Sequence, residues 1–502
     1  MKRNMRLLGV MVLLGTCINV SGQTDKTAQE GFDEFRKKAE AEFSSFSQRS
    51  WTEYQAFRDS VNQVYADFLE QAWASFEKGP AIPKPKDREF KPTPMPKGEW
   101  NKPFKSNPIR IEEVVAPVIP TPQPMPISPI PHIEEPKETW VNLTLYGTPM
   151  KVRFSDEQRF SLGTLSEASV ANAWRTLSGE QYNNTIRDCL ALRLKHQLCD
   201  WAYLQLLEKI GKVCCGEVNE ATLLTAYLYA QSGYRMRLAM SGSRLYMLFA
   251  SDYSLYDKGS FLMDGIHFYV MGTDEPARLN ICKAEFPKEQ SLALALRQEQ
   301  LLTNAPSDIR TLSSKNHPEV KCDVQVNRNL VDFYNEYPSS MYQEDFMTRW
   351  AIYANTPMQA EVRNKMYPTL RKLIDGKTQR EAVRVLLDFV QWAFVYEYDN
   401  KVWGHDRAFF SEETLFYPYA DCEDRSILFS RLVRDLMGLK VVLVYYPGHL
   451  ATAVHFTDDV QGDYLTLQNQ RFVICDPTYF GANVGQTMTD MDNSTAKAIL
   501  LE

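Results

Sequence analysis

The sequence predicts an α+β protein, and three observations support this prediction. Apolar residues at spacings of three and four, typical of amphipathic helices, precede short alternating runs that are typical of strands. This order of helix and strands occurs twice, before and after residue 310. The 502 residues also leave room for more than one core, and 44% hydrophobic with 24% charged residues is an ordinary globular composition.

Residues 1–22 have the pattern of a signal peptide. Basic residues precede an apolar run from Leu7 to Leu14 that is too short to span a bilayer, and Val20-Ser21-Gly22 offers a cleavage site. We therefore expect an exported protein, periplasmic or extracellular, without a transmembrane segment. Cys17 would allow a lipid anchor, but that motif usually has Gly, Ala or Ser where this chain has Thr16, so we favour cleavage.

Residues 23–78 are predicted to form one long amphipathic helix or a bent pair of helices. Their apolar stripe is rich in aromatic residues, among them Phe32, Phe35, Phe43, Phe46, Phe57 and Phe68. Such a stripe packs on the protein's own body or pairs with a second copy in a coiled coil. Partner docking is the alternative, and the mixed charges of the polar face do not favour a membrane surface.

Residues 79–138 are predicted to be an extended spacer. Sixteen of the 27 prolines lie between Pro80 and Pro136. Proline lacks an amide donor and favours the polyproline II conformation, so this segment is expected to separate the N-terminal helix from the globular part.

Residues 139–310 and 311–502 are predicted to form two α+β domains. In the first, helices over 166–212 and 221–232 precede strands at 235–241, 244–249 and 266–271. In the second, helices over 379–395 and 422–437 precede strands at 440–446, 449–456, 464–467 and 472–475. When Gly233 is set against Gly438, Glu217 falls opposite Cys422. When Asp-Gly-Ile-His267 is separately set against Tyr-Pro-Gly-His449, the two histidines are aligned. The first domain is therefore interpreted as a degenerate copy that lacks the thiol.

Three residues near the C-terminus form a constellation that could carry chemistry. Cys422 stands where an apolar helical stripe begins, and a helix N-terminus lowers the pKa of a thiol. His449 follows a Pro-Gly turn at the start of a strand, and Asp476 follows the end of another strand. An imidazole can take the thiol proton, and a carboxylate can orient the imidazole, so the three residues predict a nucleophilic cysteine site.

These motifs resemble the bacterial transglutaminase-like superfamily, which shares the papain-type cysteine fold. The resemblance covers residues 377–485 and rests on Asp-Cys422-Glu-Asp-Arg-Ser, Gly-His449-Leu-Ala-Thr-Ala-Val and Cys-Asp476-Pro-Thr-Tyr. It implies that Cys422 is the nucleophile, His449 the general base and acid, and Asp476 the orienting carboxylate. The chain departs from the family at Ala451, where a tryptophan is usual.

Several assignments within the site remain open at this point. His455 lies on the same strand face as His449, about 20 Å away at the usual rise per residue, so only one histidine can serve the thiol. Cys422 could instead form a disulfide with Cys475. Candidate donors to an oxyanion are Gln391, Trp403 and the backbone amide of Cys422.

The resemblance implies acyl transfer through a thioester, as hydrolysis of a peptide amide or transfer to an amine. A peptide or protein is then the expected substrate. The alternative is a catalytically inactive scaffold that binds a partner. A net charge of −7 argues against a nucleic-acid surface, and we expect no metal or cofactor because no zinc-type cysteine spacing or glycine-rich phosphate loop occurs.

Overall fold

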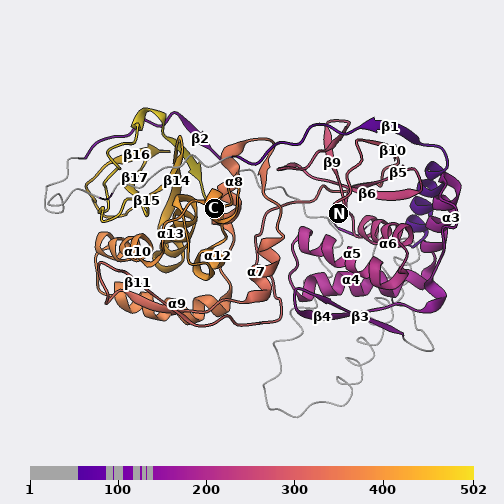
Figure 1. The fold of residues 1–502 in the computed structure, drawn as a ribbon, viewed down its shortest axis with the longest axis horizontal. Helices are drawn as coiled ribbons and strands as arrows, with labels where there is room; N and C mark the ends of the chain where they lie inside the picture. The colour runs from indigo at the N-terminus through magenta and orange to yellow at the C-terminus, as the bar shows by residue number, and fades with distance from the viewer. Residues whose placement is uncertain (1–54, 86–93, 95–105, 117–124, 127–131, 133–138) are drawn as a thin grey trace, which may run out of the picture. The chain divides into compact units, whose positions relative to one another are not determined.

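The computed structural model describes residues 55–85, 94, 106–116, 125–126, 132 and 139–502, and Arg58–Glu502 form one compact unit. The predicted signal peptide, Cys17 and the predicted helix up to residue 54 lie outside the described residues. Within the described part, helices and sheets are mixed, which confirms the predicted α+β class (Figure 1). The helices described there are all too short or too polar to cross a membrane.

The described part of the N-terminal helix ends earlier than predicted. Residues 55–69 are helical, and the indole of Trp73 donates a hydrogen bond to the carbonyl oxygen of Leu69 at 2.6 Å. Trp73–Glu77 then form strand β1, where the sequence predicts helix through residue 78. The prediction is wrong here because Phe68 and Phe76 keep a helix-like spacing, whereas strand pairing decides the local conformation.

Helices fill the first half of the predicted domain 139–310. A hairpin, β3 (Trp140–Leu145) and β4 (Thr148–Arg153), precedes four helices. The helices α3 (Glu167–Leu177), α4 (Asn183–Lys195), α5 (Asp200–Cys215) and α6 (Val218–Gln231) lie close to the predicted helical ranges 166–212 and 221–232. Helix α6 is buried along most of its length and packs between α5 and the first sheet. Its burial explains why its sequence is apolar on nearly every side.

A six-stranded sheet follows these helices. Its strands lie in the order β1-β10-β5-β6-β9-β8, with bounds β5 (Met236–Ser241), β6 (Arg244–Ala250), β8 (Phe261–Met263), β9 (Ile266–Val270) and β10 (Arg278–Cys282). Strand β1, which precedes all the others in the chain, closes one edge against β10. Strand β7 (Tyr253–Leu255) instead pairs with β13 (Ser340–Tyr342).

The domain predicted for residues 311–502 begins with the β11–β12 hairpin (Arg310–Ser313 and Lys321–Val324) and continues with helices. These helices are α7 (Arg328–Asn335), α8 (Arg349–Asn355), α9 (Ala360–Ile374), α10 (Gln379–Ala393), α11 (Asp399–Val402), α12 (Ser411–Phe416) and α13 (Cys422–Met437). The predicted helix over 422–437 is confirmed, and Gly438 ends it in the left-handed conformation at φ 66°.

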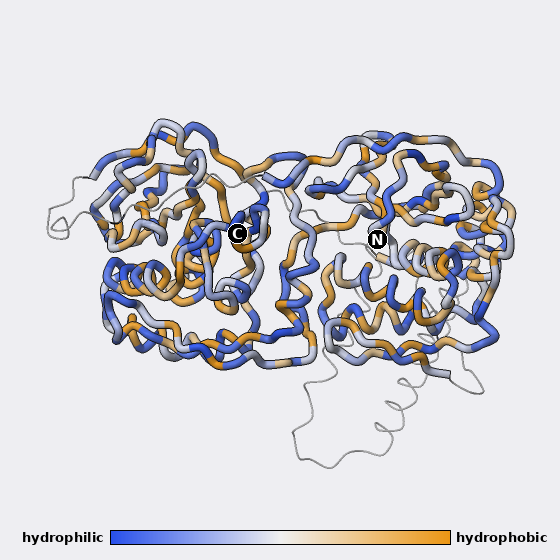
Figure 2. Tube along the Cα trace, in the orientation of Figure 1, coloured by the Kyte–Doolittle hydropathy of each residue, from blue (hydrophilic) through white to orange (hydrophobic). Residues whose placement is uncertain are grey.

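Helix α13 packs on the second six-stranded sheet. The strands lie in the order β16-β17-β15-β14-β18-β2, with bounds β2 (Glu113–Val115), β14 (Lys440–Tyr446), β15 (His449–His455), β16 (Tyr464–Leu467), β17 (Gln470–Cys475) and β18 (Lys497–Leu500). The four predicted strands between residues 440 and 475 are confirmed. Apolar residues concentrate along these strands and along α13, where they form the core between sheet and helix (Figure 2).

The two six-stranded sheets have the same strand order, as expected of an internal repeat. When β5 is matched with β14, the strands β6, β8, β9 and β10 correspond in chain order to β15, β16, β17 and β18. At the edge of the sheets, β1 corresponds to β2. In each sheet a preceding helix, α6 or α13, packs on the matched hairpin. The sheets differ at one edge, where β1 runs antiparallel to β10 and β2 runs parallel to β18.

The strand order corrects one part of the predicted repeat. His267 lies in β9, the counterpart of β17, so it does not correspond to His449 in β15. The residue at the register of His449 is Arg244, which opens β6 as His449 opens β15. The predicted alignment is wrong because it matched the residues before His267 with the Tyr-Pro-Gly turn before His449, whereas the equivalent hairpin turn contains Gly242.

The proline-rich segment is not only a spacer. Glu113–Val115 form strand β2, which extends the second sheet next to β18, and Ile109 and Val115 are buried. Residues 109–116 are the longest proline-free run between Pro80 and Pro136. Strand pairing needs amide donors, which explains why this run can join the sheet.

Candidate functional site

Cys422 is the first residue of α13, as predicted. The side chain of Asp421 caps the helix, because its Oδ1 accepts hydrogen bonds from the amides of Glu423 and Asp424 at 3.0 and 3.4 Å. Asp424 in turn accepts from the amide of Asp421 at 3.2 Å, which completes a capping box. The partly buried thiol therefore lies where the helix dipole favours a negative charge.

A tight turn places His449 beside the start of this helix. Pro447 and Gly448 connect β14 to β15, and Gly448 has φ 90°, a conformation that favours glycine. Tyr446 and His449 pair directly across the turn. Since α13 packs on both strands, the histidine is held at the end of the sheet that meets the Cys422 end of the helix.

Asp476 contacts His449, which confirms that the two predicted residues lie together. Strand β17 pairs with β15, and Asp476 follows its last residue. Nε2 of His449 lies 2.8 Å from Oδ2 of Asp476, and both residues are buried. Oδ1 of Asp476 accepts from the amides of Thr478 and Tyr479 at 2.8 and 3.2 Å. The carboxylate is therefore fixed by the loop and presents its second oxygen to the imidazole.

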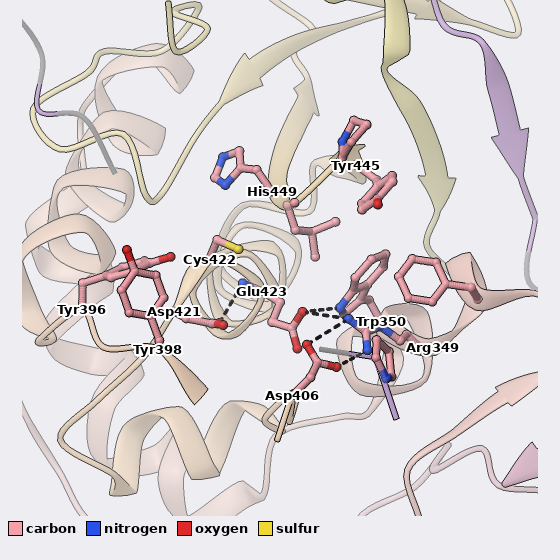
Figure 3. A pocket seen from close by; sticks show the side chains of 15 residues that line it. Arg349, Trp350, Tyr396, Tyr398, Asp406, Asp421, Cys422, Glu423, Tyr445 and His449 are labelled. Atoms are coloured by element: carbon pink, nitrogen blue, oxygen red, sulfur yellow. Dashed lines mark hydrogen bonds and ion pairs between the residues drawn. The ribbon is translucent and has the colours of Figure 1, made fainter. Parts of the chain in front are cut away.

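Cys422 and His449 line the same pocket, which has a volume of about 250 Å³ (Figure 3). Aromatic and charged side chains form most of its remaining wall. These residues are Phe346, Arg349, Trp350, Tyr396, Tyr398, Asp406, Asp421, Glu423 and Tyr445, and Pro85 of the proline-rich segment also contributes. The pocket brings the thiol and the imidazole to one cavity large enough for part of a peptide side chain.

His455 and Cys475 do not take part in this pocket. His455 pairs with Lys440 at the opposite end of β15, and its Nδ1 lies 2.9 Å from the carbonyl oxygen of Arg471. Cys475 is buried in the core between sheet and helix. The eight cysteines in the described part of the chain are all free thiols, so the alternative Cys422–Cys475 disulfide does not form in this structure.

Two of the three oxyanion candidates lie away from the pocket wall. The amide nitrogen of Gln391 donates to the carbonyl oxygens of Asp476 and Tyr479 at 3.0 and 2.8 Å, so Gln391 positions the Asp476 loop. Trp403 packs against Phe409 and Tyr417. Predicting these two side chains as donors was wrong, because their distance from Cys422 depends on loops whose path the sequence does not reveal.

A buried ionic network holds Glu423, the residue after Cys422. Glu423 accepts hydrogen bonds from Arg349 at 3.3 Å and from the indole of Trp350 at 2.7 Å, and Arg349 also binds Asp406. Burial and the neighbouring Asp406 raise the pKa of Glu423 well above its usual range. The sequence predicts that Glu423 caps the helix or pairs with an arginine of α13. The actual partners come from α8, more than 70 residues away.

Arg425 connects the three chain segments that meet at the site. Its guanidinium is fully buried and donates to the carbonyl oxygens of Ala420, Gln391 and Phe394 at 3.0, 2.8 and 3.1 Å. It also lies 5.1 Å from the ring of Phe480, in the loop that follows Asp476. Burial lowers the pKa of Arg425 to about 10. It pairs with backbone carbonyls and not with the acidic residues that the sequence suggests.

Three buried carboxylates beside the pocket are close enough to hold a cation. Asp399, Asp421 and Glu423 each offer an oxygen within 4.8 Å of the others. Each already accepts a hydrogen bond from the protein: Asp399 from the amide of Arg407, Asp421 from the helix start and Glu423 from Trp350. Each of these carboxylates therefore also has a hydrogen-bonding role in the fold.

In the predicted first domain, the region that matches the start of α13 has neither a thiol nor an imidazole. Glu217 is the N-cap residue of α6, and the helix starts at Val218. The side chain of Asn219 there donates to the carbonyl oxygen of Ser243 and accepts from the amide of Leu245, both at 2.9 Å. An amide thus ties helix to hairpin where the second domain has a thiol and an imidazole.

Glu412, on the helix that packs against α13, should make stability depend on pH. It is buried, accepts from the amide of Gln359 at 2.7 Å, and has a pKa raised to about 7 by burial. Because this folded-state pKa exceeds the unfolded value of about 4.3, folding takes up a proton between these pH values. The free energy of unfolding therefore falls as pH rises through this window, and the loss is complete above pH 7.

Replacing Glu412 by glutamine should remove this titration. The amide keeps an acceptor for Gln359, so we expect the variant to be more stable than the wild type by about 1–3 kcal/mol at pH 8, and by much less at pH 5. Urea unfolding at both pH values measures the difference. Glu361→Gln, at an exposed position in α9, is the control and should show no such change. An equal effect of Glu412→Gln at both pH values would contradict the assignment.

Comparison with known proteins gives no relative from which to transfer a function: no family model, no curated protein and no solved structure matches this chain. The resemblance to the transglutaminase-like superfamily thus remains a prediction from the motifs. The geometry nevertheless defines what the site can do. A thiol at a helix start and a carboxylate-bound imidazole in one pocket are the groups that nucleophilic catalysis requires.

Proposed function

We propose that this protein is a cysteine-dependent acyl-transfer enzyme that acts on peptide amides. Cys422 is the nucleophile, His449 the general base and acid, and Asp476 the orienting carboxylate. The observation that carries the proposal is the 2.8 Å contact between His449 and Asp476 beside the pocket that Cys422 and His449 share. The transglutaminase-like fold of the second domain, and export to the periplasm or the outside of the cell, belong to the same proposal.

The contact with Asp476 supports a different role for each ring nitrogen of His449. The carboxylate can only accept, so Nε2 of His449 carries a proton and Nδ1 is the basic nitrogen. Nδ1 takes the proton of the Cys422 thiol, and the thiolate–imidazolium pair that results is stabilised by Asp476 and by the helix dipole.

The reaction then proceeds in two half-reactions. The thiolate attacks the carbonyl carbon of the substrate amide, the C–N bond breaks, and His449 returns its proton to the leaving amine, which leaves a thioester on Cys422. Water or a second amine next gives a proton to His449 and attacks the thioester. The new C–O or C–N bond forms, the C–S bond breaks, and the thiol takes the proton back.

One observation favours the alternative of a non-enzymatic scaffold. The first domain repeats the strand order of the second without a thiol or an imidazole at the matching place. This chain thus contains one such sheet-and-helix unit that needs no such site to fold. If the second domain were also catalytically inactive, the protein would act by binding a partner through its N-terminal helix.

Labelling with iodoacetamide separates these alternatives because an enzyme requires an activated thiol. The experiment also needs no knowledge of the substrate. Cys215 is a matched control in the same chain, since its thiol is also partly buried but its pKa is raised by burial to about 12. We expect Cys422 to react at least about tenfold faster than Cys215 at pH 7, because only a thiolate is nucleophilic. Peptide mapping by mass spectrometry measures both rates in one sample.

Two histidine variants complete the labelling experiment. His449→Ala should slow the labelling of Cys422 toward that of Cys215, whereas His455→Ala, at the far end of β15, should leave it unchanged. Equal rates at the two cysteines in the wild type would contradict an activated thiol. A fast reaction at Cys422 that persists in His449→Ala would contradict the assigned base.

A further inference from the structure

The tetrahedral intermediate of the proposed reaction needs a hydrogen-bond donor for its oxyanion. With Gln391 and Trp403 away from the pocket, the side chains that can donate must come from its wall. Arg349 and Trp350 are engaged with Asp406 and Glu423. Tyr445 stacks on Trp350 at a ring distance of 5.3 Å. Tyr396 and Tyr398 are the other side chains of the wall that carry an O–H donor.

The backbone holds Tyr396 next to the nucleophile. Val395 forms a parallel bridge with Tyr419, and the amide of Ala420 donates to the carbonyl oxygen of Val395 at 3.0 Å. The segment 395–396 therefore runs beside residues 419–420, immediately before the Asp421 cap and Cys422. Figure 3 shows that Tyr396 extends toward Cys422 from a different side than His449.

Arg425 fixes the ring of Tyr396 in this position. Its guanidinium lies 5.5 Å from the centre of the ring and donates to the carbonyl oxygen of Phe394 at 3.1 Å. The same side chain holds Ala420. One buried arginine thus controls the distance between the helix start and the phenol.

The electrostatic surroundings keep the phenol protonated. Burial raises the pKa of Tyr396 far above its usual range, and the nearby Cys422 and Asp421 raise it further. A phenol that does not ionise is a permanent O–H donor. This behaviour suits a group that must donate to a negative charge developing beside the thiol.

We propose that the hydroxyl of Tyr396 donates a hydrogen bond to the oxyanion of the tetrahedral intermediate formed on Cys422, together with the backbone amide of Cys422. This inference rests on the proposed function and adds a catalytic residue to it. During acylation the carbonyl oxygen takes up the electron pair of the C=O bond, and the Tyr396 O–H stabilises that charge until the C–N bond breaks.

Tyr396→Phe tests this role, because the variant keeps the ring under Arg425 and removes only the donor. We expect the single-turnover acylation rate with p-nitrophenyl acetate to fall about 10²-fold. The rate of iodoacetamide labelling at Cys422 should stay within twofold, because alkylation at a saturated carbon forms no oxyanion. Tyr419→Phe, an exposed neighbour with an intact backbone bridge, should leave both rates unchanged.

The possible outcomes separate this inference from the function on which it rests. If Tyr396→Phe slows both acylation and iodoacetamide labelling, Tyr396 acts on the thiol. That result would overturn the role of Tyr396 as oxyanion donor. Unchanged acylation in Tyr396→Phe would overturn the inference and leave the proposed function intact. If wild-type protein forms no acetyl-enzyme by intact mass spectrometry, the proposed function fails and the inference with it.

Discussion

Replacing Asp476 by asparagine is expected to lower kcat by about 10⁴-fold, the loss known for the same exchange in a serine-protease triad. The reason is that two backbone amides bind Oδ1 of Asp476, the carboxylate oxygen that does not contact His449. Thr478 and Tyr479 donate to Oδ1, so the single oxygen of an asparagine must turn toward them. Its NH₂ group then faces Nε2 of His449 and forces the tautomer in which Nδ1 carries the proton.

This wrong tautomer cannot accept the proton of Cys422, so labelling with iodoacetamide should slow together with the acylation of p-nitrophenyl acetate. Labelling should recover as pH rises above about 8.5, where a free thiol ionises without a base. Asp458→Asn, at an exposed loop position, is the matched control. Retention of more than a tenth of the wild-type rate in Asp476→Asn would sink the proposed orientation of His449.

Replacing Arg425 by methionine is expected to reduce the free energy of unfolding by about 3–5 kcal/mol. Methionine fills a similar volume and avoids the cost of burying a charge. It leaves the carbonyl oxygens of Ala420, Gln391 and Phe394 buried without their donor, and this loss dominates. The same three carbonyls belong to the segments that carry Cys422, Tyr396 and the support of Asp476.

Guanidinium unfolding of Arg425→Met measures this loss, with Arg384→Met at an exposed position of α10 as the control. The fraction that remains folded should also label more slowly at Cys422, because the helix start is no longer held. An unfolding free energy within 1 kcal/mol of the wild type would contradict the role of Arg425 in joining the three segments.

The helix that carries the candidate nucleophile could be predicted to its last residue. Asp421 and Gly438 are strong start and stop signals, and the apolar stripe between them is regular. The contact of His449 with Asp476 could also be anticipated, since both residues stand at the ends of adjacent strands. These features depend on local patterns, which a single sequence contains.

The remaining wall of the pocket could not be predicted because its residues come from distant segments. Arg349, Trp350 and Asp406 have no motif around them. The packing of α8 against α13 brings Arg349 and Trp350 to Glu423, and Asp406 pairs with Arg349 from the segment between α11 and α12. Tyr396 lies near Cys422 through a two-residue bridge in a loop. The predicted alignment of His267 with His449 was wrong for a similar reason, because strand order within a sheet cannot be predicted from spacing along the chain.

Strands β1 and β2 have a consequence for how this chain can be shortened and how fast it folds. Both precede the domains in sequence, yet each closes the edge of a six-stranded sheet. Strand β1 pairs with residues 201 to 209 positions later, and β2 pairs with residues 384 positions later. Contacts of such high sequence separation slow folding, because long loops must close first. A chain that begins at Thr139 would keep every candidate catalytic residue but expose the edges of β10 and β18, and unpaired edges of this kind promote aggregation.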